Sequence, residues 1–144
     1  MTSIDFYFNA DDRLTVACRL AGKALQQKKR VLIYAAEPET AQKIDRLLWT
    51  SQAVSFLPHC YAHDPLAADT PVLIASGDAQ PAVACDVLLN LAAECPPFFE
   101  RHERVLEIVD RDEGQVLAGR ARFKFYRDRG YAIRNHDLSA EARR

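Results

Sequence analysis

The stretch Arg30-Val31-Leu32-Ile33-Tyr34-Ala35 decides the fold class, because it is apolar without a break from Val31 onward. A strand with one face in water would alternate apolar and polar residues, so this one is expected to be covered on both faces. A helical pattern over residues 12–28 precedes it, with N-cap residue types at 9–12. A first strand is expected at 4–8.

The remaining chain continues the alternation of strands and helices. Further elements are expected as a helix over 38–50, a long loop over 55–69, strands over 71–75, 83–91 and 104–109, and a helix over 110–129. Pro38 suits a first helical turn, and Gly130 suits a helix end. The alternation predicts an α/β fold, namely a three-layer, doubly wound (Rossmann-like), mostly parallel sheet of about five strands with helices on both faces. Residues 1–139 are expected to form one domain, and 140–144 a flexible tail.

Composition indicates an ordinary soluble protein. Of the 144 residues, 49% are hydrophobic and 27% charged, and no apolar run approaches the roughly 20 residues of a membrane helix. The opening residues do not resemble a secretory signal, and none of the four cysteines form a C-x-x-C pair. A cytoplasmic protein with reduced cysteines and no membrane contact is expected.

Charge is distributed unevenly along the chain. The total is 19 − 20 = −1, but residues 119–144 carry 8 − 3 = +5 and residues 1–118 carry 11 − 17 = −6. The basic end is expected to attract an acidic partner, although the total charge is too small to indicate a general DNA-binding protein.

Motifs for catalysis are missing from the sequence. It has no G-x-x-x-x-G-K-[ST], no G-x-G-x-x-G and no G-x-S-x-G. His59, Cys60 and His63 do not have the paired spacing of a zinc site, so we interpret them as loop residues that form hydrogen bonds. The acids of 110–113 suit the start of a helix. We therefore predict a non-catalytic protein with no cofactor and no metal.

The helix expected at 110–129 carries a mixed face. With Phe123 at zero and 100° per residue, Val116 falls at about 20°, Arg127 at 40°, Arg120 at 60° and Lys124 at 100°. The natural core face is then the group at about 120–220°, formed by Leu117, Ala118, Ala121 and Phe125. A peptide with acidic and apolar residues would use the whole outward face, because arginine binds carboxylates with two N–H groups. The alternative is that Phe123 packs under a loop and the cations are solvated.

Trp49 is the second candidate for binding. With Ile44 at zero, the apolar stripe of the helix over 38–50 lies at about 300–60°, whereas Trp49 falls at about 140°. An exposed tryptophan is a favoured interface anchor, and Phe56, Leu57 and Pro58 could complete an apolar patch. The alternative is that the loop over 55–69 folds back over Trp49.

Several stretches, in order, resemble the chi subunit of bacterial DNA polymerase III. They are Ile4-Asp5-Phe6-Tyr7-Phe8, Gln27 to Ile33, Asp45-Arg46-Leu47-Leu48-Trp49, Ser55-Phe56-Leu57-Pro58-His59, and Arg120-x-Arg122-Phe123-Lys124-x-Tyr126-Arg127 with Gly130-Tyr131. Each piece is weak alone, but the ordered set covers nearly the whole chain.

The resemblance implies two protein partners. One is psi, a small subunit that tethers the family to the clamp loader, and its site matches Trp49 and Phe56 with Leu57, Pro58 and His59 adjacent. The other is the acidic C-terminal tail of the single-stranded-DNA-binding protein, which ends in Ile-Pro-Phe. Its site matches Arg120 and Phe123, with Lys124, Arg127 and Val116 beside them; a lysine of some relatives is replaced here by Val116. DNA contact is then mostly indirect.

Two other functions compete with this adaptor role. One is a small nucleotide-binding α/β enzyme, against which the missing glycine-rich loop argues. The other is direct binding of single-stranded DNA through residues 120–134, although no run of stacking aromatics on strands is evident there.

Overall fold

The computed structural model describes residues 2–50, 58–76, 84–96 and 98–139. Their strands form one sheet of seven in the order β3-β4-β2-β5-β6-β1-β7, and every pairing is parallel. The strands are β1 (Ser3–Ala10), β2 (Val31–Tyr34), β3 (His59–Tyr61), β4 (Val72–Ala75), β5 (Val87–Asn90), β6 (Arg104–Asp110) and β7 (Ile133–Asp137). The predicted α/β class and parallel sheet are confirmed, with seven strands rather than about five.

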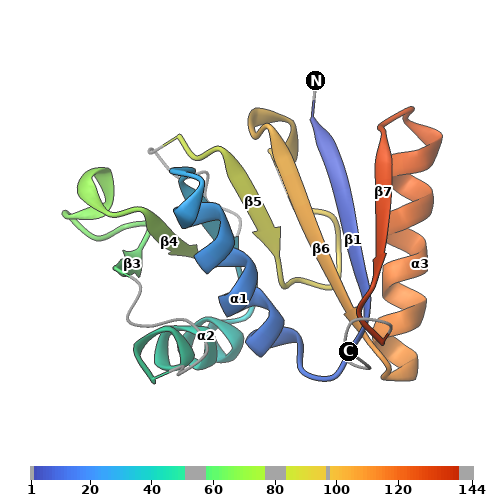
Figure 1. Cartoon of the computed structure of the whole chain (residues 1–144), viewed down its shortest axis with the longest axis horizontal. Helices are drawn as coiled ribbons and strands as arrows, with labels where there is room; N and C mark the ends of the chain where they lie inside the picture. The colour runs from blue at the N-terminus through green and yellow to red at the C-terminus, as the bar shows by residue number, and fades with distance from the viewer. Residues whose placement is uncertain (1, 51–57, 77–83, 97, 140–144) are drawn as a thin grey trace.

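Helices cover both faces of the sheet, as predicted. Helices α1 (Arg13–Gln26) and α2 (Pro38–Thr50) lie on one face and α3 (Glu113–Asp128) on the other (Figure 1). Two short 3-10 helices, η1 (Ala67–Asp69) and η2 (Phe99–Arg101), complete the described elements. The region described contains no helix long and apolar enough to cross a membrane.

Local sequence explains the helix ends. The Asp12 carboxylate accepts from the Leu14 amide at 3.1 Å, and the Asp112 carboxylate accepts from the Gln115 amide at 3.1 Å, so both helices begin at an N-cap aspartate. Gly130 follows α3 with φ +84°, a conformation that favours glycine. The predicted stop at Gly130 is confirmed.

The unbroken apolar run of β2 has the cause that the sequence indicated. Val31 and Ile33 enter the core beneath α1 and α2, whereas Leu32 and Tyr34 enter the core on the α3 side. Each residue of β2 is therefore buried on one face or the other.

Both edge strands, β3 and β7, were missed by the sequence prediction. β3 has only three residues, all half-buried, and lies within the expected long loop. β7 reads Ile-Arg-Asn-His-Asp and has no buried residue. Neither strand shows apolar alternation or a fully apolar run, because each lies at an edge of the sheet and is only partly covered. The expected flexible tail, 140–144, lies outside the described residues.

Candidate functional site

A buried polar network sets the orientation of α3. Arg122 is 3% exposed, and its Nε donates to Oε1 of the fully buried Glu107 on β6 at 2.8 Å. Tyr126 donates its hydroxyl to Glu107 Oε2 at 2.7 Å, and the Asn90 amide donates to the same carboxylate at 3.0 and 3.1 Å. These bonds satisfy a carboxylate that would otherwise be costly to bury. They fix which side of α3 faces the sheet.

Both acidic groups of this network have pKa values that follow from burial. Desolvation raises the pKa of Glu107, although the charge of Arg122 and the hydrogen bonds from Tyr126, Asn90 and Arg122 oppose this. Desolvation and the neighbouring Glu107 carboxylate raise the pKa of Tyr126 far above its ordinary value. The tyrosine therefore stays a hydrogen-bond donor at any physiological pH.

Close packing and aromatic contacts complete the seat of α3. A Cβ on Gly119 would lie 2.7 Å from Cγ2 of Val109, so glycine permits the helix to approach β6. The Phe6 ring contacts Phe123 edge to face at 5.3 Å and Tyr126 at 6.1 Å. These contacts leave one side of Phe123 packed against the core.

The core face predicted for α3 was wrong, although the predicted cationic face is exposed. The buried residues are Gly119, Arg122 and Tyr126, while Leu117 is 58% exposed and Ala121 is exposed. The prediction searched for apolar spacing, but the residues that enter the core include an arginine. Glu107 was the missed signal, because a charged residue inside the apolar strand Val105 to Val109 requires a buried partner.

The five residues predicted to bind an acidic tail lie on or beside the outward face of α3. Arg120, Lys124 and Arg127 are exposed, whereas Val116 and Phe123 are half-buried against the core at the border of this face. Among the described residues neither Arg120 nor Lys124 has an ion-pair partner, and Arg127 pairs only with the adjacent Asp128 at 3.5 Å. The face thus presents exposed cations, which can pair with carboxylates, beside a half-buried aromatic ring.

A second surface is built around Trp49. Its side chain is 58% exposed on α2, which confirms that it points away from the apolar stripe. The Trp49 ring contacts the His59 ring edge to face at 5.0 Å, and His59 Nε2 lies 3.0 Å from Asp45 Oδ1. The His59 side chain, which belongs to β3, is fully buried. It therefore packs beneath the exposed Trp49 ring and holds it in place. Pro58 is exposed beside it, and Phe56 and Leu57 lie outside the described residues.

These two surfaces lie at opposite edges of the sheet. β3 is one edge strand and β7 the other. In Figure 1, α2 lies near β3 and α3 runs beside β7. The fold therefore separates the Trp49 surface from the cations of α3 by the width of the sheet.

Comparison with known proteins identifies the family. A family model described as DNA polymerase III chi subunit, HolC, matches residues 1–134. A DNA polymerase III subunit chi from Pseudomonas aeruginosa is 37% identical over 96% of this chain and 98% of that protein. The chain belongs to the DNA polymerase III chi subunit family.

More distant chi subunits also match the chain in sequence, and a solved structure shares its fold. The chi subunit of Escherichia coli K12 is 28% identical over 82% of this chain and 80% of its own length, and that of Haemophilus influenzae is 27% identical over 85% of each. The C-terminal domain of the DEAD-box protein Dbp5 superposes with a TM-score of 0.68 at 13% identity, covering 95% of this chain and 91% of that one. The Dbp5 likeness concerns the fold alone.

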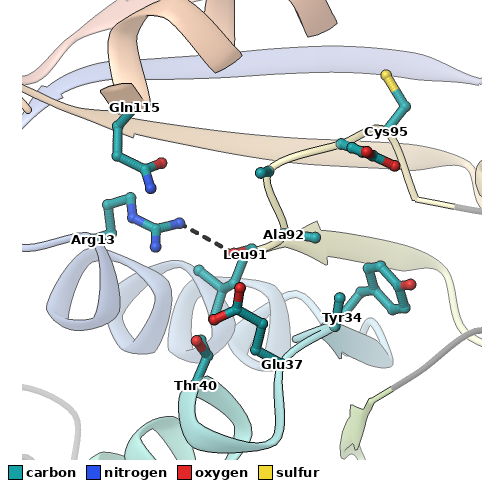
Figure 2. A pocket seen from close by; sticks show the side chains of 11 residues that line it. Arg13, Tyr34, Glu37, Thr40, Leu91, Ala92, Cys95 and Gln115 are labelled. Carbon is teal, nitrogen blue, oxygen red and sulfur yellow. Dashed lines mark hydrogen bonds between the residues drawn. The ribbon is translucent and has the colours of Figure 1, made fainter. Parts of the chain in front are cut away.

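This chi-family chain also has a cavity that the sequence did not predict. It has a volume of about 490 Å³ and lies where the carboxyl ends of β2 and β5 meet, between residues such as Tyr34 and Leu91 (Figure 2). There the chain leaves β2 for α2 in one direction and β5 for β6 in the other, the usual ligand position in such sheets. Arg13 donates to the Leu91 carbonyl at 3.2 Å, and Glu37 and Glu94 also line the cavity.

The histidines considered for a metal site have other neighbours. His59 contacts Asp45, and the His63 ring stacks on Tyr61 at 5.6 Å. Among the described residues, no group of three or more His, Cys, Asp or Glu side chains is placed to hold a metal ion.

Proposed function

We propose that this chi-family chain is a non-catalytic adaptor that connects the clamp loader to the protein coating single-stranded DNA. The surface of Trp49, Phe56, Leu57, Pro58 and His59 binds psi. The face of Arg120, Phe123, Lys124, Arg127 and Val116 binds the acidic C-terminal tail of the single-stranded-DNA-binding protein. The observation that carries the proposal is the exposure of Trp49 and of the cations Arg120, Lys124 and Arg127, on elements at opposite edges of one sheet.

Charge and shape on α3 support a tail partner. Arg120 and Lys124 are exposed without carboxylate partners in the described region, so an acidic peptide can pair with them and displace only water. Phe123 and Val116 offer apolar contact at the border of the same face. The buried pair of Arg122 with Glu107 holds the helix rotated so that these cations point outward.

The Trp49 surface suits a partner that is bound more permanently. Trp49 projects from α2 with its ring held by the buried His59, which is itself fixed by Asp45. A rigid, exposed aromatic ring loses little conformational entropy on binding, which is typical of interface anchors. His59 acts in this proposal by positioning Trp49.

Separation of the two surfaces allows the adaptor to connect its two partners. Both partners can be held at once, because neither surface overlaps the other. Joining two modest contacts in one assembly raises their effective concentration, so the tail contact can be weak alone and strong within the complex. Through the tail contact, DNA is reached by way of its coating protein.

The tail site is tested by fluorescence anisotropy with a labelled acidic peptide ending in Ile-Pro-Phe. Saturable binding is expected, and Arg120→Ala should weaken it by about 1.5–3 kcal/mol, the worth of a charged hydrogen bond. Lys43→Ala, which removes an exposed cation from α2, should leave it unchanged. Binding should also weaken with salt, since exposed charges are screened. An affinity independent of Arg120 and of ionic strength would remove this half of the proposal.

The psi site is tested by coexpression and gel filtration with the psi subunit. Trp49→Ala should abolish or greatly weaken the complex, since buried interface tryptophans contribute about 2 kcal/mol or more. Leu66→Ala is the control, because Leu66 is 66% exposed on the loop before η1 and lies outside the proposed surface. Equal loss of complex in both variants would contradict a specific role for Trp49.

A nucleotide-binding function is favoured only by the cavity between β2 and β5. Its lining has one cation, Arg13, against the carboxylates of Glu37 and Glu94, which is the wrong balance for a polyphosphate. A thermal-shift titration with ATP and GTP separates the functions, because a ligand present at 100 times its Kd stabilises a protein by about 2.7 kcal/mol.

A further inference from the structure

One part of the sheet lacks a covering helix. Helix α1 packs against β2, β5 and β6, and in Figure 1 β1 and β7 have no described helix in front of them. Side chains alternate along β1, so Ile4 and Phe6 enter the core on the α3 side. Asp5 and Tyr7 face the opposite, open side.

Three cationic groups surround the single carboxylate on this open face. Asp5 is fully buried, and its Oδ2 accepts from Arg104 at 2.8 and 3.2 Å. Its Oδ1 lies 3.0 Å from Arg134 Nε and 3.0 Å from His136 Nε2. Two guanidinium groups are always charged, so the cluster keeps a net charge of at least +1 even with His136 neutral.

The excess cations are accessible from solvent. The Arg134 side chain is 63% exposed and that of Arg104 is 35% exposed. Arg104 and His136 already supply hydrogen bonds to both oxygens of Asp5. Arg134 contacts the same two oxygens, at 3.0 Å from Oδ1 and 3.4 Å from Oδ2, so the cluster holds one more arginine than the charge of Asp5 balances and can bind an anion from outside the chain.

Aromatic rings lie beside these cations on adjacent strands. Tyr7 and His136 are register partners, and their rings stack at 4.4 Å with an interplanar angle of 12°. His136 belongs to the edge strand β7, and its side chain is 35% exposed. Cations beside stacked rings on an open sheet face are the combination that binds single-stranded nucleic acid.

Other charged side chains surround the open face. On the same face of the sheet, helix α1 exposes Arg19 and Lys23. Toward the carboxyl ends of the strands, a small hollow is lined by Asp11, Asp12 and the same Arg19, and Asp11 also pairs with Arg111, so acidic and basic groups are mixed there. A polyanion is therefore attracted most to the amino-terminal half of β7, where the Arg134 side chain is exposed.

We propose that the open face of β1 and β7 binds single-stranded nucleic acid, with Arg104 and Arg134 contacting phosphates and the Tyr7–His136 pair stacking on a base. This site lies on the face of the sheet opposite α3 and does not depend on the proposed tail contact.

The test is fluorescence anisotropy with a labelled oligothymidylate of about 12 nucleotides, within the usual length for such sites, at low salt and without other proteins. Saturable binding is expected. Arg104→Ala and Arg134→Ala should each weaken it about fivefold, as loss of a partly exposed ion pair does. Each should also reduce the slope of log affinity against log salt by about 0.7, the release expected per phosphate on a single strand. Arg120→Ala and Arg127→Ala should leave both unchanged.

Two further variants separate binding from a purely structural role of the cluster. Asp5→Asn removes the neutralising charge and should tighten binding about fivefold, whereas a structural cluster would only lose stability. Tyr7→Leu should weaken binding about fivefold or more through lost stacking. Circular dichroism verifies that each variant is folded, and Arg134→Ala serves where Asp5→Asn does not fold, because Arg134 is exposed.

Several outcomes would overturn the proposal. Absence of wild-type binding at low salt removes it. Loss of binding in Arg120→Ala but not in Arg134→Ala assigns nucleic acid to α3 instead. Equal competition by duplex DNA or by polyglutamate identifies a general anion surface or an acidic protein partner, because neither can stack bases on Tyr7 and His136.

Discussion

Arg122 and Glu107 form an ion pair that is almost completely withdrawn from water, with 2.8 Å between Nε and Oε1 and side-chain exposures of 3% and 0%. Each partner lies on a different element, Arg122 on α3 and Glu107 on β6. The pair therefore fixes how α3 is rotated on the sheet. All proposed tail-binding cations depend on that rotation.

Arg122→Met should destabilise the protein by about 3–5 kcal/mol, because it leaves the Glu107 charge buried without its partner. The loss should be smaller at pH 5 than at pH 7. Burial already raises the pKa of Glu107, and removing Arg122 raises it further. A raised carboxyl pKa contributes stability below the unfolded value of about 4.3, which is lost as the pH rises through the folded value.

Urea unfolding at both pH values measures this effect. Arg120→Met is the matched control, since Arg120 lies two residues earlier on the exposed side of α3 and its replacement should change stability by no more than about 0.5 kcal/mol. Similar midpoints for the two variants would show that the buried pair does not hold α3 in place.

Gly119→Ala should destabilise the protein by about 1–2 kcal/mol despite the higher helix propensity of alanine. The added Cβ would lie 2.7 Å from Val109 Cγ2, and valine on a strand has little freedom to move. Removing those methyl groups should relieve the clash. In a thermal-unfolding double-mutant cycle, Gly119→Ala should therefore cost less in a Val109→Ala background. Purely additive losses would contradict close packing at this point.

Sequence periodicity predicted the buried strands well, because burial leaves a direct mark on composition. The run over Val31–Tyr34 is apolar for the reason given above, with alternate residues in two cores. β3 and β7 were not predicted because they are edge strands, paired on one side only and partly covered. Their existence depends on backbone pairing with β4 and β1, which no local pattern records.

The candidate site was predicted only in part, because sequence periodicity records local geometry and not contacts between distant elements. Exposure of Arg120, Lys124, Arg127 and Trp49 follows from helical geometry and is confirmed. The opposite side of α3 was assigned wrongly, since Leu117 is exposed and Arg122 is buried. The contact of Arg122 with Glu107 joins residues 15 positions apart. Such a pair becomes visible only when the two elements are packed together. Binding by either surface stays a prediction.

Cys18 and Cys85 should resist alkylation in the folded protein. Both are buried free thiols, and desolvation raises the pKa of each to about 11. At pH 8 only about one thiol in a thousand would then be the reactive thiolate. Iodoacetamide labelling followed by peptide mass spectrometry should show modification at these positions only in denaturant. Rapid labelling under native conditions would mean that the core beneath them opens readily.

Asp5→Asn should make the free energy of unfolding less dependent on pH in the acid range. Burial raises the pKa of Asp5, but hydrogen bonds from His136 and Arg104 and the charges of Arg104 and Arg134 outweigh it, so the pKa lies below its ordinary value. A depressed carboxyl pKa contributes stability that is complete above the unfolded value of about 3.9 and is lost as the pH falls through the folded value. Wild type should therefore lose stability below about pH 4 more steeply than Asp5→Asn. Asp69→Asn, at an exposed position in η1, should keep the wild-type slope in the same urea titrations. Parallel curves for wild type and Asp5→Asn would mean that the cations around Asp5 do not stabilise its charge, and the electrostatic account of the open face would fail with it.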